Sequence, residues 1–389
     1  MKKFCITSGT RADFGLLKNL IYALRDDEQL DYKLVVMGTH FSSEYGNSYE
    51  EILDAGLSID FRCDMLLSST SHAGVAKSFG LTAIAMADYF GSNNFDAVVV
   101  LGDRYEALAV SSVALIFNIP IIHLCGGEVT SGAIDDSIRH SITKMSSLHF
   151  VSNKEYERRV IQLGENDNTV HITGGLGVDA ISSLKVFKRS ELEKNIDFKF
   201  GEKNLIVTFH PAKAYLGASE KQLTNLLAAL HDFQDIFLIF TMPNADAESD
   251  TLWNLIKQFV AQRENSILIK SMGQKNYYSA LKIVDGVIGN SSSGISEAPS
   301  FGIGTINIGD RQKGRLLADS IISCDGSVSS IKNSINLLYS KGFRNKLSKS
   351  VNPYGRPGAV EKIMHVLKKI KSEELVKQPF KDINYGSQI

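Results

Sequence analysis

The chain has 389 residues, of which 43% are hydrophobic and 22% charged, and its formal net charge is -1. This composition is that of an ordinary soluble globular protein, and at about 150 residues per domain the length predicts two domains. Nucleic-acid binders normally carry a strongly basic face, so the balanced charge argues against a nucleic-acid partner.

The beginning of the chain and the cysteines indicate a cellular compartment. "MKKFCITSGTRADFG" has a basic tip but few apolar residues before Arg11 and Asp13, so we expect neither a signal peptide nor a membrane span. We therefore expect a cytosolic protein with no membrane partner. The cysteines form no C-x-x-C pair, which predicts reduced thiols rather than a zinc site or disulfides: Cys5, Cys63, Cys125 and Cys324.

Short apolar runs that end in Gly, Ser or Asn alternate with longer helix-like segments in the first half of the chain. Six of these runs predict buried strands: "FCITSG" (4–9), "YKLVVMG" (32–38), "DAVVVLGD" (96–103), "PIIHLCGG" (120–127), "LHFVSN" (148–153) and "VHITGG" (170–175). The segments between them are mostly long enough for crossover helices. The alternation therefore predicts a parallel α/β sheet.

The pattern breaks near residues 175–200, where the polar stretch "VDAISSLKVFKRSELEKN" follows, and then restarts. The second set of predicted strands is "NLIVTFHP" (204–211), "IFLIFTMP" (236–243), "SILIKS" (266–271), "DGVIGN" (285–290), "TINIGD" (305–310) and "SIISC" (320–324). We predict two facing Rossmann-like domains, at 1–175 and 176–357. A basic helix is expected around 359–378, with its charges on a solvated face.

Ligands of open α/β sheets bind beyond the carboxyl ends of the strands, and the residues at those positions are unusually polar here. In the first domain they are Ser8 to Arg11, Gly38 to His40, Asp103 with Arg104, and His123 to Glu128. In the second they are His210, Asn244 with Asp246, Asn290 to Ser293, and Asp310 with Arg311. Two such edges predict an active site in the cleft between the domains.

The stretch "IGNSSSGISE" (288–297) places three hydroxyls between two glycines, directly after an apolar run. A helix starting near Ser292 would direct N–H groups and hydroxyls at an anion such as a diphosphate, although Ser292 or Ser293 would equally serve as a simple N-cap. Glu297 is placed to accept hydrogen bonds from a ribose diol, and Arg311 to neutralise a phosphate. The stretch does not fit G-x-S-x-G, so a nucleophilic serine is disfavoured.

Other ligand-binding motifs have little support. "GGLGVDA" contains G-x-G-x-x-A, but the charged break follows it where an acidic ribose ligand should stand, so we interpret it as a turn at the domain crossing. No G-x-x-x-x-G-K-[ST] loop is present. The histidines form no H-x-x-x-H pair, so we expect neither a catalytic metal nor another cofactor.

Eight ordered motifs over residues 3–357 are similar to one known family. They are "SGTRADFGLL", "VLGDRYEAL", "GGEVTSGAIDDSIRHSITKMSSLHF", "RVIQLGE", "TFHP", "PNAD", "GNSSSGISEAPSFG" and "INIGDRQKGR". Together they resemble the hydrolysing UDP-N-acetylglucosamine 2-epimerases of sialic-acid and legionaminic-acid biosynthesis. The resemblance implies the two-domain fold of sugar-nucleotide glycosyltransferases (GT-B-like), with the C-terminal helix, residues 358–389, packing back on the first domain.

The resemblance also implies an activity. Members eliminate UDP from a UDP-2-acetamido sugar to give a glycal, and hydrate the glycal to a free manno-configured sugar. That chemistry needs carboxylates near the sugar, and cations or N–H groups for the diphosphate. By matching motifs, the catalytic residues would be Asp103, Asp135, Glu128, His210 and Arg139. The substrate-binding residues would be Arg11, His40, Arg104, Asn244, Ser291, Ser292, Glu297 and Arg311.

Some of these residues have an ordinary structural alternative. Asp103 and Asp135 would also serve as helix caps, with Asp136 as a first-turn charge, and a histidine before proline, such as His210, is often structural. Many relatives carry Glu where this chain has Cys125. Three roles for Cys125 stay open: a thiolate activated by a neighbouring arginine, a small neutral filler with Glu128 doing the work, or a bystander to Asp103 and Asp135. The filler is favoured, because buried cysteines behave as small hydrophobes.

The substrate has two candidates. "DMLLSSTSHAGVAKSFG", "TMPNAD" and "GGLGVD" resemble the branch acting on UDP-N,N'-diacetylbacillosamine more than the branch acting on UDP-GlcNAc. Two further function classes stay open, a UDP-sugar-dependent glycosyltransferase of the same architecture and a non-catalytic UDP-sugar sensor. Retention of Asp103 and Asp135 disfavours the sensor, and the GDR and IDDSIRH motifs disfavour the transferase. We expect a homodimer or homotetramer.

Overall fold

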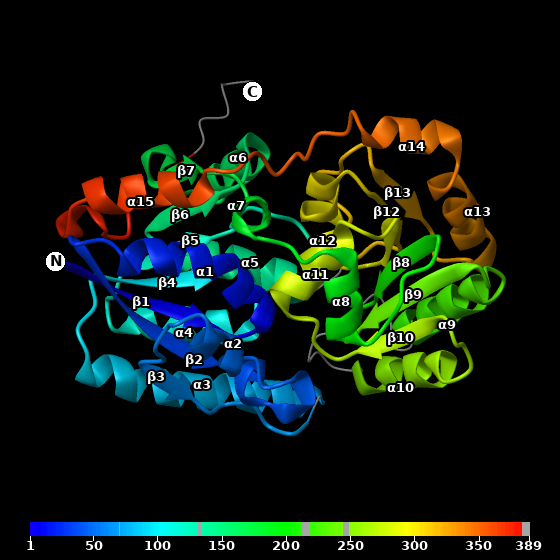
Figure 1. The fold of residues 1–389 in the computed structure, drawn as a ribbon. Coiled ribbons are helices and arrows are strands. Elements are labelled where there is room, and N and C mark those ends of the chain that lie inside the picture. The colour runs from blue at the N-terminus through cyan, green and yellow to red at the C-terminus, as the bar shows by residue number, and fades with distance from the viewer. Residues whose placement is uncertain (70, 131–133, 212–217, 244–248, 383–389) are drawn as a thin grey trace.

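The computed structural model describes residues 1–69, 71–130, 134–211, 218–243 and 249–382. Over these ranges the chain forms two parallel β-sheets that lie side by side, each with helices on both faces (Figure 1). The first domain is the unit around the sheet of β1 to β7, and the second is the unit around the sheet of β8 to β13. No helix within the described ranges is long and apolar enough to cross a membrane.

The first sheet has the strand order β3-β2-β1-β4-β5-β6-β7, with every neighbouring pair parallel. Its strands are β1 (Lys2–Ser8), β2 (Leu30–Met37), β3 (Phe61–Cys63), β4 (Ala97–Leu101), β5 (Ile121–Leu124), β6 (Leu148–Val151) and β7 (Val170–Ile172). The helices between them are α1 (Arg11–Arg25), α2 (Tyr49–Asp54), α3 (His72–Ser92), α4 (Tyr105–Ile116), α5 (Ile134–Met145) and α6 (Lys154–Gln162).

The second sheet has the order β10-β9-β8-β11-β12-β13 and is also parallel. Its strands are β8 (Lys203–Thr208), β9 (Ile236–Thr241), β10 (Ser266–Ile269), β11 (Gly286–Gly289), β12 (Gly304–Ile308) and β13 (Ile321–Cys324). The remaining helices are α7 (Leu176–Ser183), α8 (Arg189–Ile196), α9 (Ala218–His231), α10 (Ser249–Val260), α11 (Gly273–Leu281), α12 (Ser292–Ser296), α13 (Val328–Leu338), α14 (Lys341–Leu347) and α15 (Ala359–Lys369). Short 3-10 turns are η1 (Gly38–Phe41), η2 (Ser43–Tyr45), η3 (Asp167–Thr169), η4 (Ala298–Phe301) and η5 (Ser372–Glu374).

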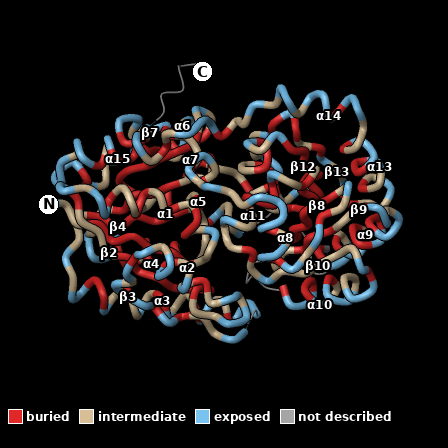
Figure 2. The backbone as a smooth tube through the Cα atoms, viewed as in Figure 1, coloured by how far each residue is buried: buried red, intermediate tan, exposed pale blue. Residues whose placement is uncertain are grey.

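Burial explains why the strands read as continuous apolar runs. Every residue of β4, "AVVVL", is buried, because helices cover both faces of a parallel sheet (Figure 2). The strand order reverses between β1 and β4 in the first sheet and between β8 and β11 in the second. The loops after these strands are therefore where a ligand site is expected.

The predicted fold class is confirmed, and a strand lies at each of the twelve predicted runs. The sequence analysis missed β3, a three-residue edge strand with the sequence Phe61-Arg62-Cys63. So short a segment carries no periodicity of its own. It is held by its pairing with β2, from Val35 opposite Phe61 to Met37 opposite Cys63.

The C-terminal helix is shorter than expected. Only residues 359–369 form α15, and the chain then leaves the helix with an extended Ile370 and forms the turn η5. The ammonium of Lys2 donates to the carbonyls of Leu367, Lys368 and Ile370, which satisfies the carbonyl groups at that helix end. The apolar face of α15 lies in the core of the first sheet through Ile363 and Leu367.

The polar stretch near residues 175–200, predicted as the domain boundary, forms two helices, α7 and α8. The glycines that precede α7 provide its N-cap, and α7 packs on α1 and α15. Leu176 of α7 belongs to the core of the first sheet, whereas Ala180 belongs to a core of the second sheet. The helix α7 thus connects the two packing units beside the cavity described next.

Candidate active site

A cavity of about 340 Å³ lies between the two domains, beyond the carboxyl ends of β1, β4, β8 and β11. Of the predicted site residues that lie in the described part of the chain, all but His40 line it. From the first domain these are Arg11, Asp103, Arg104, Glu128, Asp135 and Arg139. From the second domain they are His210, Ser291, Ser292, Glu297 and Arg311. The structure thus brings together residues up to three hundred positions apart in the sequence.

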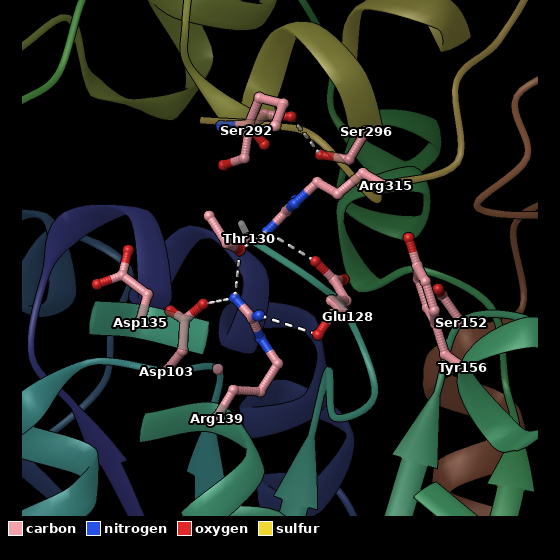
Figure 3. A network of polar contacts seen from close by, with 12 residues as sticks. Asp103, Glu128, Thr130, Asp135, Arg139, Ser152, Tyr156, Ser292, Ser296 and Arg315 are labelled. Atoms are coloured by element: carbon pink, nitrogen blue, oxygen red, sulfur yellow. Dashed lines mark hydrogen bonds and ion pairs between the residues drawn. The ribbon is translucent and has the colours of Figure 1, made fainter. Parts of the chain in front are cut away.

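Arg139 of α5 lies at the centre of the polar network in Figure 3. It is only 1% exposed and forms an ion pair with the carboxylate of Asp103. It also donates to the carbonyl oxygen of Glu128 at 3.0 Å and to the hydroxyl of Thr130 at 3.0 Å. Burial, followed by the positive charges of Arg315 and Arg311, lowers the pKa of Arg139. The paired Asp103 offsets that unfavourable environment, so Arg139 fixes both a carboxylate and the loop that carries Glu128.

Two ion pairs join a carboxylate of the first domain to an arginine of the second. Nη2 of Arg315 lies 2.8 Å from Oε2 of Glu128 (Figure 3). Nη2 of Arg311 lies 3.6 Å from Oδ2 of Asp135. Glu128 and Arg315 are 13% and 8% exposed, so their charges are poorly screened by water. Carboxylates and guanidinium groups therefore face each other across the cavity.

The loop that presents Asp103 is held from behind by a buried histidine. Gly102, which precedes Asp103, has φ +73°, a conformation that glycine adopts without strain. Nε2 of His123 lies 2.8 Å from the Gly102 carbonyl oxygen, and Nδ1 lies 3.1 Å from the hydroxyl of Thr143. Burial lowers the pKa of His123 to about 3. The ring is therefore neutral at physiological pH and donates through Nε2.

Asp103 is not the cap of the helix that follows it. The N-cap of α4 is Arg104, whereas Asp103 pairs with Arg139. In the first turn of α5, the carboxylate of Asp136 accepts the N–H of Thr130 at 2.7 Å. Asp135, the second residue of α5, lines the cavity beside Arg311.

Arg104 lies beside two buried carboxylates, those of Glu106 and Asp13. Nε of Arg104 donates to both carboxylate oxygens of the buried Glu106 at 3.2 Å. Oδ2 of Asp13 accepts the N–H groups of Gly9 and Thr10 at 3.2 and 3.0 Å. Burial raises the pKa of both Asp13 and Glu106, against the lowering effect of the Arg104 charge. The Arg104 side chain, which lines the cavity, is thus held in place by its ion pair with Glu106 and lies near the charge of Asp13.

Arg11 begins α1 and reaches the other domain. Its guanidinium donates to the hydroxyl of Ser271, which follows β10. Nearby, Nε2 of Gln274 donates to the carbonyl of Gly15 at 2.6 Å. Burial lowers the pKa of Arg11, opposed by the charge of Glu51. The first turn of α1 is therefore a point where the domains touch beside the cavity.

The segment from Asn290 to Ser293, called the serine loop below, follows β11. The end of β11 approaches the neighbouring strand β8 closely. Gly289 has φ +141°, and a Cβ there would lie 1.9 Å from the carbonyl oxygen of Thr208, so only glycine fits. The N-cap of α12 is Ser291, one residue before the expected position, and its side chain accepts the N–H of Ser293. Ser292 lines the cavity with a hydroxyl that the cap does not use.

Glu297 is held by two donors at the end of α12. The hydroxyl of Ser293 donates to Oε2 at 2.5 Å, and that of Tyr278 donates to Oε1 at 3.2 Å. Burial raises the pKa of Glu297, although both hydrogen bonds lower it. Each carboxylate oxygen retains a further acceptor position, so Glu297 could still accept from a ligand hydroxyl.

His210 is positioned by an asparagine of the serine loop. Its backbone N–H donates to Oδ1 of Asn290 at 2.7 Å, and its carbonyl accepts from Nδ2 at 2.8 Å. The carbonyl of Asn290 also accepts from Arg311 at 3.3 Å and from Gln312 at 2.8 Å. The buried Asn290 therefore fixes two predicted site residues at once.

The structure does not bring His40 into the cavity. Its ring is fully buried, with Nε2 2.9 Å from the hydroxyl of Ser8 and Nδ1 2.9 Å from the hydroxyl of Ser48. Burial lowers the pKa of His40 to about 4, so the ring is neutral and bonded on both sides. The ring thus connects the end of β1, at Ser8, with Ser48, the residue before α2. The predicted Asn244 lies outside the described residues.

Cys125 adopts an unusual backbone conformation beside Glu128. Its φ is +64°, which a side chain larger than glycine rarely adopts. The thiol lines the cavity, and burial, with the negative charge of Glu128 in addition, raises its pKa. These surroundings disfavour a thiolate.

The sequence analysis missed several residues of the cavity wall. Arg315 is the principal one, because it pairs with Glu128 and donates to Thr130 at 3.5 Å. The available signal was the motif "DRQKGR", which contains a second arginine four residues after Arg311. The loop of Arg315 is held by Tyr156, whose hydroxyl accepts the N–H of Leu316 at 3.5 Å.

Among the described residues, no group of three His, Cys, Asp or Glu side chains is placed to bind a metal ion.

Residues 22–368 match the family model described as UDP-N-acetylglucosamine 2-epimerase. The GDP/UDP-N,N'-diacetylbacillosamine 2-epimerase (hydrolyzing) of Campylobacter jejuni is 41% identical over 345 residues, which cover 88% of this chain and 89% of that protein. Polysialic acid biosynthesis protein P7 of Escherichia coli is 37% identical over 98% of each chain.

Solved structures share the architecture. The UDP-GlcNAc 2-epimerase of Neisseria meningitidis, crystallised with UDP-GlcNAc, superposes with a TM-score of 0.81 over 95% of this chain and all of that chain. The sequence identity in this comparison is 17%, so the match concerns the fold, which is GT-B-like in both.

Proposed function

Because this chain belongs to the UDP-N-acetylglucosamine 2-epimerase family, we propose that it is a hydrolysing 2-epimerase. It would convert a UDP-2-acetamido sugar and water into UDP and a free manno-configured 2-acetamido sugar, for nonulosonic acid synthesis. The observation that carries the proposal is the single cavity in which Asp103, Glu128 and Asp135 face arginines of both domains.

The first step of the proposed reaction is an elimination. A carboxylate removes the proton at C2, the C1–O bond to the diphosphate breaks, and a C1=C2 double bond forms. The C2 proton is weakly acidic, so the base has to be held against it, and the negative charge on the departing UDP has to be stabilised. Carboxylates and guanidinium groups within one cavity suit both requirements.

The second step is the hydration of the glycal. A hydroxyl from water adds to C1, and a proton is delivered to C2 on the face opposite to the one from which it was removed. This step needs an acid and a base on different sides of the ring, which a single carboxylate does not provide. Three carboxylates on separate segments, the loop after β4, the loop after β5 and the first turn of α5, meet that need.

We assign proton transfer to Asp103, Asp135 and Glu128, with Arg139 orienting Asp103 and the Glu128 loop. Arg311 and Arg315 would turn from their carboxylate partners to the diphosphate, leaving Asp135 and Glu128 free to act. His210 would contact the diphosphate or the sugar from the second domain. Support comes from the 2.8 Å contact and low exposure of the Glu128–Arg315 pair, and from the place of Asp135 opposite Arg311 in the same cavity.

The uridine and diphosphate would lie against the second domain. Ser291 and Ser292 would bind the diphosphate, and Glu297 would accept from the ribose hydroxyls. Arg11 and Arg104 would approach the diphosphate and sugar from the first domain. Support comes from the fact that all of these residues, from both domains, line the same cavity. The domain division proposed for this arrangement is 1–175 and 176–357.

The favoured substrate is UDP-N,N'-diacetylbacillosamine. Its support is the 41% identity to a relative named for that substrate. The second candidate is UDP-GlcNAc, which would give N-acetylmannosamine, and the relative named for polysialic acid biosynthesis supports that alternative. Both sugars carry the C2 acetamido group and differ at C4 and C6.

NMR spectroscopy of the purified protein with each UDP-sugar tests the proposal. The expected products are UDP and a free manno-configured sugar, formed without any acceptor. An intact UDP-sugar inverted at C2 would instead indicate a non-hydrolysing epimerase, and turnover only with an added acceptor would indicate a glycosyltransferase. Binding of UDP without turnover of any UDP-sugar would indicate a sensor.

A further inference from the structure

Glu297 differs from the carboxylates of the opposite wall, because hydroxyl groups rather than arginines surround it. Those other carboxylates each face a guanidinium group: Asp103, Glu128 and Asp135. Within the described ranges, no lysine, arginine or histidine forms an ion pair with Glu297, whose charge is stabilised by the hydroxyls of Ser293 and Tyr278. A carboxylate without a cation beside it repels a diphosphate and attracts neutral hydroxyl donors.

The direction of the hydrogen bonds around Glu297 follows from the number of protons available. An ionised carboxylate only accepts, and a serine hydroxyl carries one proton, so Ser293 donates to Glu297. In the 2.7 Å contact between the hydroxyls of Tyr277 and Ser293, the donor is therefore Tyr277. Burial raises the pKa of both Tyr277 and Tyr278, so each phenol keeps the proton that it donates.

These donors fix the orientation of the Glu297 carboxylate. Ser293 donates to Oε2 and Tyr278 to Oε1, so the group cannot turn without losing a hydrogen bond. The first turn of α7 also comes close, since a Cβ at Gly177 would lie 3.4 Å from Oε1. Glu297 lines the cavity, and each of its oxygens keeps one further acceptor position. Two such positions side by side suit two neighbouring hydroxyls, as on a ribose.

Tyr278 is itself rigidly held. It lies on α11, is only 3% exposed, and its ring centroid is 5.7 Å from that of Phe301. Ser293 belongs to the separate helix α12. Two helices thus hold Glu297 before a ligand arrives, so a ligand does not have to order the carboxylate when it binds.

We propose that Tyr278 and Ser293 are positioning residues that make the site select a ribonucleotide over a 2′-deoxyribonucleotide, by holding Glu297 in the orientation that accepts from both ribose hydroxyls. The inference rests on the proposed function, in which Glu297 accepts from the ribose of UDP. It adds the two residues that act through Glu297 and the class of nucleotide that they select.

Calorimetry of the full chain with UDP and with 2′-deoxy-UDP tests the inference. The native protein should bind UDP about tenfold more tightly or better, because the deoxy ligand lacks a hydrogen bond to a charged group. Tyr278→Phe keeps the ring and removes the hydroxyl, so the preference for UDP should shrink about threefold or more. Ser293→Ala should act in the same direction. The matched control is Tyr339→Phe, which removes a 3.4 Å contact with Asp285 outside the cavity and should leave the preference unchanged.

A double variant separates positioning from a general structural role. Glu297→Gln should lose most of the preference for UDP, and adding Tyr278→Phe should change the preference no further, since Tyr278 acts through Glu297. The inference would be overturned by equal weakening of both nucleotides in Tyr278→Phe and Ser293→Ala proteins that stay folded by circular dichroism. It would also be overturned by a native protein that binds UDP and 2′-deoxy-UDP equally, which leaves the proposed function standing. A native protein that binds neither nucleotide would overturn both.

Discussion

The two walls of the cavity differ in the chemistry they present. The wall from the first domain carries the carboxylates of Asp103, Glu128 and Asp135. The wall from the second domain carries the hydroxyls of the serine loop together with Arg311 and Arg315. Each carboxylate is paired with a guanidinium group, and two of the three pairs cross from one domain to the other.

This difference indicates a division of labour. Groups that transfer protons need to stand at the sugar, while groups that bind a diphosphate need to be polar or positive and need not titrate. Changes on the first wall should therefore reduce the rate more than the affinity for UDP. Changes on the second wall should do the reverse. Four substitutions can break or sharpen this comparison, and they follow in order of expected effect.

The largest effect is expected for Asp103→Asn. Turnover should fall by roughly 10²–10⁴-fold, the usual range for an acid–base group, while UDP affinity stays nearly unchanged. An NMR turnover assay and calorimetry with UDP measure the two quantities. The control is Asp64→Asn, which removes an exposed carboxylate paired with Arg62. Parallel losses of rate and UDP affinity in Asp103→Asn would show that Asp103 has a structural role.

Glu128→Gln should reduce turnover on the order of 10²-fold or more, because the amide cannot carry the proton. The amide can still accept from Arg315, so the protein should stay folded by circular dichroism. Glu193→Gln is the matched control, since Glu193 pairs with Arg189 at 3.0 Å on the surface helix α8. Glu128→Gln with near-native turnover would remove Glu128 from the catalytic group.

Ser292→Ala tests the second wall. Loss of one hydrogen bond to a charged group is worth about 1.5–3 kcal/mol, so UDP should bind roughly 10- to 150-fold more weakly. Ser292 is more informative than Ser291, because Ser291 caps α12 and its loss would also disturb the helix. The exposed Ser329 of α13 provides the control as Ser329→Ala. Unchanged UDP affinity would place the diphosphate elsewhere in the cavity.

The smallest effect is expected for Cys125→Ala. Turnover should stay within about tenfold of the parent, because burial and the Glu128 charge keep the thiol neutral and a neutral thiol is a weak proton carrier. The same turnover assay measures it. A folded but inactive Cys125→Ala, with a parent that iodoacetamide inactivates unless UDP is present, would identify a working thiolate.

Much of the architecture could be predicted from the sequence. The twelve long apolar runs gave strands because both faces of each sheet are covered, whereas the three-residue β3 depends on pairing with β2. The family prediction is confirmed by the match over residues 22–368. The C-terminal helix was predicted too long, because the chain turns extended at Ile370 and the carbonyls at the helix end are bonded by Lys2, a contact between the two ends of the sequence.

The candidate site was predictable only where a residue follows a strand or belongs to a motif. Asp103 and Ser292 satisfy that rule, and so does His40, which is nevertheless buried between two serine hydroxyls. Arg315 was missed because its importance comes from a contact with Glu128, 187 positions away in the sequence. Sequence position therefore indicates which residues reach the sheet edge, but not which of them face the cavity.

The most direct test of the proposed chemistry is the hydrogen at C2 of the released sugar when the reaction is run in D2O. We predict a free manno-configured sugar that carries one deuterium at C2, because a carboxylate removes that proton and solvent replaces it on the opposite face. NMR spectroscopy and mass spectrometry of the product measure it, with Asp103→Asn run beside the parent. A released sugar that retains protium at C2, or that keeps its original configuration there, would contradict the elimination and hydration proposed for this cavity.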